Sequence, residues 1–289
     1  MSNGKEREQK RLNEVMEMIN SEINYLQKEA QKRKEEVIFQ RRHFGDEVKV
    51  NMDTFDDYLE SIIHLRQEAS SLTVSERIYK QVSDRLSTLQ RMKEKPYFGR
   101  IDFKENDMPA AEQVYIGISS LTDPNDEQFL VYDWRAPISG IYYDYEPGPA
   151  KYETPGGTIE GRLENKWQFI IKNGILEGMF DTSVTIGDEI LQQVLGKSTD
   201  KKMQSIVATI QKEQNKVIRH DRGKLLIVHG AAGSGKTSVA LQRIAYLLYK
   251  YRDNLNAEQI ILFSPNKMFS NYVSNVLPEL GEENMQQMT

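Results

Sequence analysis

Residues Leu225–Thr237, LLIVHGAAGSGKT, are the most informative about the fold of the C-terminal part of the chain. Its first five residues are apolar enough for a buried strand, and Gly230–Thr237 completes the pattern G-x-x-x-x-G-K-[ST]. Glycines in such a loop let backbone N–H groups approach a phosphate, and the following helix N-terminus adds partial positive charge. We therefore expect a phosphate-binding loop here that opens a helix over Lys236–Tyr251.

The loop assigns a role to each residue type. Backbone N–H groups from Ala232 to Thr237 are expected to surround the β-phosphate, Lys236 is the candidate catalytic residue, and the Thr237 hydroxyl is the expected Mg²⁺ ligand. Upstream, the amide of Gln214 can donate to and accept from an adenine edge, which favours ATP over GTP. The expected cofactors are ATP and Mg²⁺. The residues expected to bind nucleotide are Gln214, Gly230, Ala231, Ala232, Gly233, Ser234, Gly235, Lys236, Thr237 and Ser238.

Strands and helices are expected to alternate around this loop. Leu225–His229 and Gln259–Ser264 are the predicted buried strands, and their spacing is typical of right-handed βαβ units with a parallel sheet. Only two such strands fit in the sequence, whereas a free-standing doubly wound domain needs more. The predicted helices are Gly187–Leu195, Lys201–Arg219, Lys236–Tyr251 and Lys267–Leu277.

The middle of the chain has a different periodicity. Short β-branched and aromatic runs alternate with Pro, Gly and Asn turns, which predicts an antiparallel sheet. Lys172-Asn173-Gly174-Ile175 is a strong hairpin signal. Asp133-Trp134-Arg135 fits a packed corner with a structural ion pair better than a functional site. The predicted strands are Gln113–Ser119, Gln128–Asp133, Ile141–Tyr145, Gln168–Lys172 and Leu176–Phe180.

The first third predicts two long helices folded back on each other. Apolar residues recur at steps of three and four from Leu12 to Val37 and again from Phe55 to Met92. A helix of about 40 residues is about 60 Å long, so the pair is expected to project as an arm. The turn is expected within Asp46–Asp57, which is acidic. Asp53, Thr54, Asp56 and Asp57 are explained as helix caps, or as an acidic tip presented to a basic channel or a bound metal of a partner, and both can hold.

The composition of the chain excludes several kinds of site and several classes of protein. The chain has no Cys, which excludes disulfides and thiolate metal sites and is compatible with a cytoplasmic location. No secretion signal or membrane span is expected. Lys+Arg against Asp+Glu number 18 and 18 before Pro96, 8 and 18 over 96–200, and 12 and 7 thereafter. His43, His64, His220 and His229 lack metal-ligand spacing.

Together these patterns predict an α+β chain with three parts. Residues 1–95 are expected to form the coiled-coil arm, an antiparallel helical hairpin. Residues 96–183 are expected to form a small antiparallel β region. Residues 184–289 are expected to form the start of a RecA-like P-loop α/β domain.

Several short sequence motifs resemble those of known helicase families. Gln214 with the phosphate loop, Gln242–Leu248 (QRIAYLL) and Phe263–Lys267 (FSPNK) resemble the Q motif, motif I and motif Ia of superfamily 1 helicases similar to UvrD. More specific strings resemble the HelD family of helicase-like ATPases, which associate with bacterial RNA polymerase. These strings are Tyr97–Phe103 (YFGRIDF), Tyr132–Ser139 (YDWRAPIS), Thr185–Glu189 (TIGDE) and Val276–Glu282 (VLPELGE).

The resemblance implies a function. HelD-like proteins insert an N-terminal coiled-coil arm into the secondary channel of RNA polymerase, release nucleic acid and recycle the enzyme with ATP hydrolysis. The 1–95 arm would then be the polymerase-binding element, and Asp56 and Asp57 would lie near a catalytic Mg²⁺. Motif Ia implies a possible nucleic-acid contact through Ser264 or Asn266. No Walker B Asp-Glu, second RecA-like domain or arginine finger follows, so the sequence indicates an N-terminal fragment with little hydrolysis of its own.

Three alternatives stay open. A superfamily 1 DNA helicase translocating on single strands begins almost at the Q motif, whereas about 210 residues precede it here, and the acidic middle argues against a basic, aromatic groove. A chromosome-organising coiled-coil ATPase places the phosphate loop before the coil rather than after it. A purely non-catalytic interaction protein suits this fragment itself.

Overall fold

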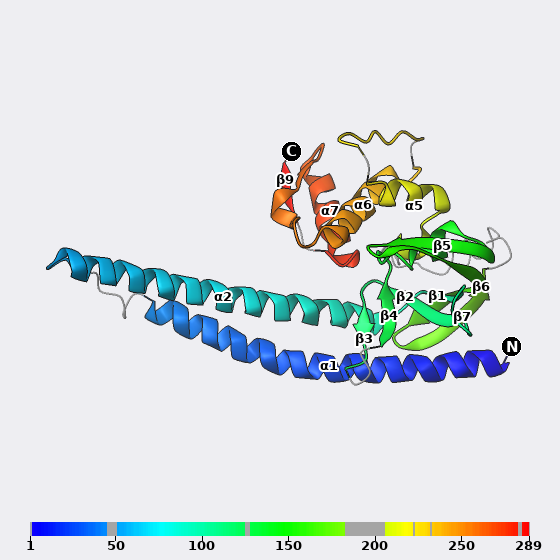
Figure 1. Ribbon diagram of the computed structural model, residues 1–289, viewed down its shortest axis with the longest axis horizontal. Coiled ribbons are helices and arrows are strands. Elements are labelled where there is room, and N and C mark those ends of the chain that lie inside the picture. The colour runs from blue at the N-terminus through cyan, green and yellow to red at the C-terminus, as the bar shows by residue number, and fades with distance from the viewer. Residues whose placement is uncertain are drawn as a thin grey trace. The chain divides into compact units, whose positions relative to one another are not determined.

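The computed structural model describes residues 2–44, 51–124, 128–182, 206–221, 223–231, 233–282 and 285–288. It divides into two compact units, residues 16–93 and residues 1–15 together with 94–289. The predicted α+β class is confirmed, with two long helices, a mostly antiparallel sheet, and then helices with short strands (Figure 1). Among the described residues, no helix has the length and apolarity needed to cross a membrane.

The unit formed by residues 16–93 is an antiparallel helical hairpin. It contains most of α1 (Ser2–His43) and α2 (Phe55–Glu94). Two ion pairs between the helices fix their direction, because Glu22 lies 2.8 Å from Arg85 and Arg41 lies 2.7 Å from Glu76. Early residues of α1 therefore face late residues of α2, which confirms the predicted hairpin.

The apolar seam of this hairpin is shorter than its sequence period suggests. Ile19, Val37 and Leu89 are buried, whereas Phe55 and Leu59 at the start of α2 are 76% and 46% exposed. The predicted turn within Asp46–Asp57 lies partly outside the described residues, which resume at Asn51. The start of α2 therefore presents apolar side chains to solvent.

Residues 99–181 form a seven-stranded sheet. The strand order is β3-β4-β2-β1-β6-β5, with β7 also paired to β6. Every pair is antiparallel except β2 with β4, where Ile116 and Tyr132 are parallel partners. The strands are β1 (Gly99–Glu105), β2 (Glu112–Gly117), β3 (Leu121–Thr122), β4 (Phe129–Asp133), β5 (Gly148–Thr154), β6 (Gly157–Lys172) and β7 (Ile175–Asp181).

The hairpin between β6 and β7 is the one that the sequence predicted. Lys172 pairs with Ile175, and the two residues between them, Asn173 and Gly174, have φ of 49° and 75°. Positive φ at both central residues is the requirement of a tight type I′ turn, which Asn-Gly meets at low cost. The turn fixes the register of β7 on β6.

One predicted strand is wrong. Ile141–Tyr145 was expected to be extended, but α3 (Gly140–Asp144) is helical. The bend begins before α3, because Ser139 N–H donates to the Ala136 carbonyl at 3.1 Å. Tertiary packing of Tyr142 and Tyr143 in the core outweighs their strand propensity.

The first residues of α1 pack on the sheet rather than on the hairpin. Gln9 Oε1 accepts from the Leu176 N–H at 2.8 Å, and its Nε2 donates to the Gly174 carbonyl at 3.2 Å. Arg11 Nη2 donates to the Leu130 carbonyl at 3.0 Å. Residues 1–15 therefore belong to the unit that contains the sheet, while the three-part domain division of the sequence stays a prediction.

The C-terminal part is mainly helical. In the part of the chain that the structure describes, the βαβ unit predicted between Leu225–His229 and Gln259–Ser264 is not formed. β8 instead pairs in parallel with β9, with α7 between them, and its residues Ile261 and Phe263 are 49% and 77% exposed rather than buried. The predicted helices over Lys236–Tyr251 and Lys267–Leu277 are confirmed as α6 and α7. The elements are η1 (Ile206–Thr209), α5 (Lys212–Arg219), α6 (Lys236–Lys250), η2 (Ala257–Gln259), β8 (Ile261–Phe263), α7 (Lys267–Glu279) and β9 (Gln286–Met288).

Two further predictions here need correction. The helix expected over Lys201–Arg219 is broken, because Gln211 is extended (φ −84°, ψ 159°) and starts α5 anew after η1. The buried strand expected at Leu225–His229 is absent, and Leu225 and Ile227 are each 79% exposed. No strand among the described residues pairs with this segment, so its apolar side chains have no sheet to join. The predicted helix Gly187–Leu195 and residues 201–205 lie outside the described residues.

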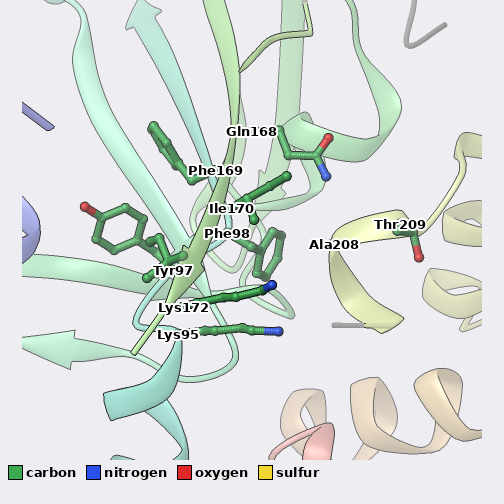
Figure 2. Close-up of a pocket in the computed structure, with 10 residues that line it drawn as sticks. Lys95, Tyr97, Phe98, Gln168, Phe169, Ile170, Lys172, Ala208 and Thr209 are labelled. Atoms are coloured by element: carbon green, nitrogen blue, oxygen red, sulfur yellow. The ribbon is translucent and has the colours of Figure 1, made fainter. Parts of the chain in front are cut away.

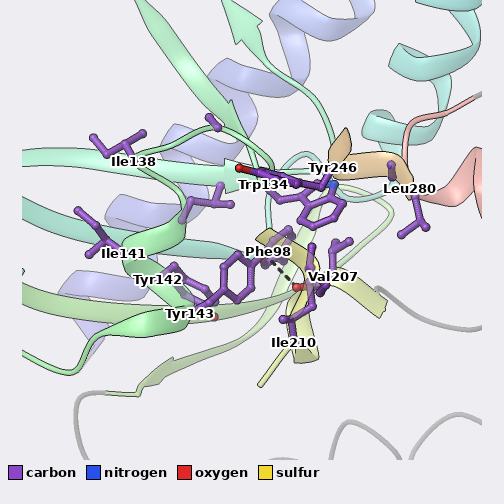
Figure 3. Close-up of a cluster of buried hydrophobic side chains, with 14 of the residues drawn as sticks. Phe98, Trp134, Ile138, Ile141, Tyr142, Tyr143, Val207, Ile210, Tyr246 and Leu280 are labelled. Carbon is purple, nitrogen blue, oxygen red and sulfur yellow. Dashed lines mark hydrogen bonds between the residues drawn. The ribbon is translucent and has the colours of Figure 1, made fainter. Parts of the chain in front are cut away.

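A single core joins the sheet to the helices that follow it. Figure 3 shows Trp134, which follows β4, packed among side chains from α3, η1 and α6, including Tyr143, Val207 and Tyr246. Tyr143 donates its hydroxyl to the Val207 carbonyl at 3.0 Å. The helical part that carries the phosphate loop is thus fixed to the sheet.

Candidate nucleotide-binding site

The Gly-rich loop lies between the exposed Leu225–His229 segment and α6. Gly233 and Gly235 have φ of 80° and 79°, and the Ser234 N–H donates to the Ala231 carbonyl at 3.2 Å. Positive φ favours glycine strongly, so the spacing of the motif follows from the shape of the turn. Ala232 lies outside the described residues.

Gly230 is needed for a different reason. A Cβ placed on it would lie 2.8 Å from the Ser234 Oγ, which is closer than packed atoms approach. The loop therefore closes on itself at its first residue, and a larger residue there would push Ser234 away.

Lys236 folds back over the loop. Its ammonium Nζ donates to the carbonyls of Gly230 at 2.9 Å and Ala231 at 2.6 Å. The positive charge therefore stays over the glycine turn rather than pointing into solvent. This is the position expected of a Lys that meets phosphate oxygens.

The N-terminus of α6 faces the same loop. Its N-cap is Gly235, which makes no side-chain cap, and its first turn contains no acidic residue. Backbone N–H groups in a first turn lack partners within the helix and favour an anion. Thr237 and Ser238 are half-buried in this turn. These residues fit a triphosphate with Mg²⁺ by donor chemistry and charge.

Gln214 lies beside the loop, as the sequence predicted. It is the third residue of α5, where its Oε1 accepts from the Gln211 backbone N–H at 3.0 Å. A Cβ placed on Gly235 would lie 3.3 Å from the Gln214 Nε2. The side chain that we expect to meet a nucleotide base is therefore held at the edge of the turn that we expect to meet its phosphates.

The Asp133-Trp134-Arg135 corner is structural. Arg135 Nη2 lies 2.7 Å from Asp133 Oδ2, Arg135 also pairs with Glu282, and Trp134 is fully buried. Burial alone would lower the pKa of Arg135, but the Asp133 and Glu282 carboxylates outweigh it and raise that pKa. The prediction of a packed corner with an ion pair is confirmed.

The two motif Ia residues are engaged within the fold. Asn266 caps α7 by accepting from the Phe269 N–H at 2.9 Å. Ser264 is 6% exposed, and its hydroxyl lies 2.6 Å from that of Ser270. Their place after β8 is the predicted one, but their side-chain oxygens already hold α7 in place.

A cavity of about 50 Å³ lies elsewhere, against β6 (Figure 2). It is lined by Phe98, Phe169 and Thr209 among others, and Lys95 and Lys172 extend over it in the same direction. Lys172 lies 3.5 Å from Glu177. Ligand pockets for molecules of nucleotide size are usually several hundred Å³, so this cavity is too small for a nucleotide.

The start of α2 confirms the capping explanation for Thr54 and Asp57. Thr54 Oγ1 accepts from the Asp57 N–H at 3.1 Å and donates to the Asp57 carboxylate at 2.5 Å. Asp53 and Asp56 are exposed. Asp57 therefore stabilises the helix start, whereas Asp53 and Asp56 are available to a partner. Among the described residues, no group of His, Cys, Asp and Glu is arranged to hold a metal ion.

The sequence patterns gave no sign of two residues that hold α5, the helix that carries Gln214: Arg219 and Arg243. Arg219 donates to backbone carbonyls of the corner after β4, and Arg243 donates to carbonyls at the end of α5. An Arg near a helix end is common, so no local pattern distinguishes them. The two residues are distinguished only by the packing of α5 between the corner and α6.

Comparison with known families agrees with this geometry. A family model described as DNA helicase IV HelD, N-terminal domain, matches residues 5–202. A second model, described as UvrD/REP helicase N-terminal domain, matches residues 210–289, which include Gln214, the loop and β8. The comparison with curated proteins gave no match. Since the first model covers more than half of the 289 residues, the chain belongs to the HelD family of UvrD-like superfamily 1 helicases.

Proposed function

We propose that this chain serves an ATP-using, helicase-like motor that binds RNA polymerase through its helical hairpin and helps to release nucleic acid from it. The observation that carries the nucleotide part is the Lys236 ammonium held over the glycine turn at the uncapped N-terminus of α6. The family membership supports the motor.

Different residues of the chain would contact different parts of Mg²⁺–ATP. Backbone N–H groups of the loop and the first turn of α6 would hold the triphosphate, Lys236 would contact its β- and γ-oxygens, and Thr237 would ligate Mg²⁺. Gln214 would contact the adenine edge. ATP, when bound with Mg²⁺, supplies the free energy of hydrolysis that a motor needs.

The side chains exposed at the end of the hairpin support the proposal that the hairpin binds a partner protein. Met52 and Phe55 are each 76% exposed and Tyr58 is 41% exposed, next to the exposed carboxylates of Asp53 and Asp56. Apolar anchors rimmed by charges of one sign are typical of a surface that docks on a partner of opposite charge. A basic channel of RNA polymerase, which the HelD family binds, has the required chemistry. We refer to Met52–Glu60 as the hairpin tip.

A superfamily 1 helicase that translocates on single-stranded DNA is the second candidate. It is favoured by the match of residues 210–289, and by Phe263, which is 77% exposed beside Ser264. Against it, the oxygens of Ser264 and Asn266 already bond within the fold. Direct binding of a single strand by the purified chain would favour this candidate.

Capture of RNA polymerase tests the proposal. The tagged chain is compared with a variant lacking residues 20–86, with Lys236→Ala, and with the tip variant Asp53→Lys/Asp56→Lys. We expect the deletion to abolish capture and the tip variant to weaken it about tenfold through lost charge complementarity. Lys236→Ala should leave capture unchanged.

The matched control is Glu17→Lys/Glu68→Lys, which makes the same charge change along the hairpin away from its tip. It should leave capture within about twofold of the original chain. Equal loss in the control and the tip variant would show that net charge, not the tip, governs binding. Full capture without residues 20–86 would contradict the hairpin as the polymerase-binding element.

A further inference from the structure

We propose that Arg243 and Arg219 set the base preference of the phosphate loop by clamping α5 so that Gln214 stays against Gly235. The inference rests on the proposed nucleotide binding and adds two positioning residues to it. The hydrogen bonds of both arginines among the described residues go to α5 and to the corner after β4, so both act through the helix that carries Gln214.

Arg243 holds the C-terminal end of α5. It lies in the second turn of α6, and its Nη1 donates to the carbonyls of Val217 at 2.8 Å, Ile218 at 3.4 Å and His220. Carbonyls at a helix end lack partners within the helix, and a cation there also complements the helix dipole. Because α6 begins with Lys236, this contact ties α5 to the helix that starts at the phosphate loop.

Arg219 anchors the same end of α5 to the sheet. Its Nη2 donates to the Trp134 carbonyl at 2.7 Å, and its Nη1 donates to the Arg135 and Ala136 carbonyls at 3.2 and 3.3 Å. Asn215, one turn earlier, accepts from its Nε at 3.1 Å and so orients the guanidinium. The corner is packed into the core, since Trp134 is fully buried.

Gln214 sits at the opposite end of α5. Its Oε1 accepts the Gln211 N–H, which leaves the Nε2 donors and a second lone pair on Oε1 for another group. An isolated helix of eight residues is unstable in water, so tertiary contacts must hold α5 in place. The two arginines supply those contacts at one end, and the placement of Gln214 at the other end depends on them.

This placement has a chemical consequence. Adenine offers an acceptor beside a donor on one edge, whereas guanine offers two acceptors there. A fixed Gln amide donates to one adenine atom and accepts from the next. With guanine in the same place, the amide oxygen would face a second acceptor, and that hydrogen bond would be lost. If α5 moves, the amide no longer discriminates, while Lys236 and the loop still hold phosphates. Base preference and phosphate affinity therefore separate.

The experiment measures binding of ATP, GTP and inorganic tripolyphosphate, each with Mg²⁺, to the full 289-residue chain by calorimetry. The variants are Arg243→Met, Arg219→Met, the conservative Arg243→Lys, and Gln214→Ala. Lys216→Met, an exposed residue of α5, is the matched control. Tripolyphosphate reports an intact loop, because it carries no base.

We expect Arg243→Met and Arg219→Met to lower the ratio of ATP to GTP affinity about tenfold, as Gln214→Ala does, with tripolyphosphate affinity changed less than about twofold. Arg243→Lys should recover part of the ratio, and Lys216→Met should keep all of it. Adding Gln214→Ala to Arg243→Met should cause little further loss, since both act on one contact.

Three results would overturn the inference. The arginine variants could keep the full ATP preference of the original chain, or they could lose tripolyphosphate binding, which would make them supports of the loop. The original chain could also bind tripolyphosphate without preferring ATP. Failure of the original chain to bind any of the three ligands would instead remove the proposed nucleotide function, and this inference with it.

Discussion

Strand β1 and the segment Leu225–His229 belong to the same compact unit, yet the more charged of the two is buried. β1, with the sequence GRIDFKE, keeps Ile101 at 0% and Arg100 at 7% exposure. LLIVH leaves Leu225 and Ile227 each 79% exposed. The difference lies in their neighbours: β1 is paired on both edges, with β2 and β6, whereas the segment pairs with no described strand.

The two buried charges of β1, Arg100 and Asp102, are tolerated because both have partners. Arg100 pairs with Glu8 of α1 and with Asp102, and Tyr115 donates to Glu8 Oε2 at 3.0 Å. Burial alone would lower the pKa of Arg100, but its hydrogen bond to Tyr115 and the Asp102 and Glu8 carboxylates raise it. Arg100 therefore stays charged inside the unit, and the network ties α1 to the sheet.

Apolarity alone does not place a segment in a core. A strand also needs backbone partners, because unpaired N–H and C=O groups are costly to bury. LLIVH has the composition of a buried strand without those partners. β1 has the partners and carries charges that the surrounding residues neutralise.

Hydrogen exchange should show the largest contrast. Amides of β1 that bond to β2 and β6 should open only with unfolding, so exchange there should be slowed by at least about a thousandfold. Amides of Leu225–His229 should exchange nearly as fast as in an unfolded peptide. Exchange measured by mass spectrometry on peptides covering both segments decides this, and equal protection of the two would refute the contrast.

Breaking the ion pair of β1 comes next. Arg100→Met should reduce the free energy of unfolding by about 3–5 kcal/mol, because it leaves the Glu8 carboxylate buried without its cation. Urea denaturation followed by Trp fluorescence measures the loss. The double variant Glu8→Gln/Arg100→Met is the control and should recover much of it. A loss below 1 kcal/mol in the single variant would mean that the pair is not buried.

A matched pair of apolar truncations gives the smallest effects. Ile101→Ala should cost about 2–5 kcal/mol, as is usual for a fully buried Ile. Ile227→Ala, the same chemical change at an exposed site, should cost less than about 0.5 kcal/mol. The same urea titrations report both values. Similar costs at the two positions would place Ile227 in a core that the structure does not contain.

Much of the fold followed from local patterns. The helical hairpin, the Asn173-Gly174 turn, α6 and α7 were predictable because each depends on periodicity or on a residue that a particular backbone conformation favours. β1 and β5 were missed, since charged residues interrupt their apolar runs and their stability comes from distant partners. The helix α3 and the unpaired LLIVH segment were predicted wrongly because their conformations also depend on residues distant in the sequence.

In the candidate site, too, some features were predictable from the sequence and others were not. The loop geometry and the position of Gln214 beside it were predictable, since the motif residues are fixed by positive φ and by the capping of α5. Arg219 and Arg243 were not, because their targets are backbone carbonyls far away in sequence. Ser264 and Asn266 were correctly placed after a strand. The cap that Asn266 makes on α7 follows a common local pattern, whereas the bond between Ser264 and Ser270 depends on how the chain packs.

Binding of Mg²⁺–ATP to the purified chain shows whether Lys236 and the glycine loop form a nucleotide site. Equilibrium binding is compared among the original chain, Lys236→Ala, and Lys224→Ala, which removes the same charge from an exposed residue upstream of the loop. We expect Lys236→Ala to weaken binding at least about tenfold, since a charge-assisted contact to phosphate is lost, and Lys224→Ala to change it less than about twofold. Equal binding by the original chain and Lys236→Ala would contradict this expectation.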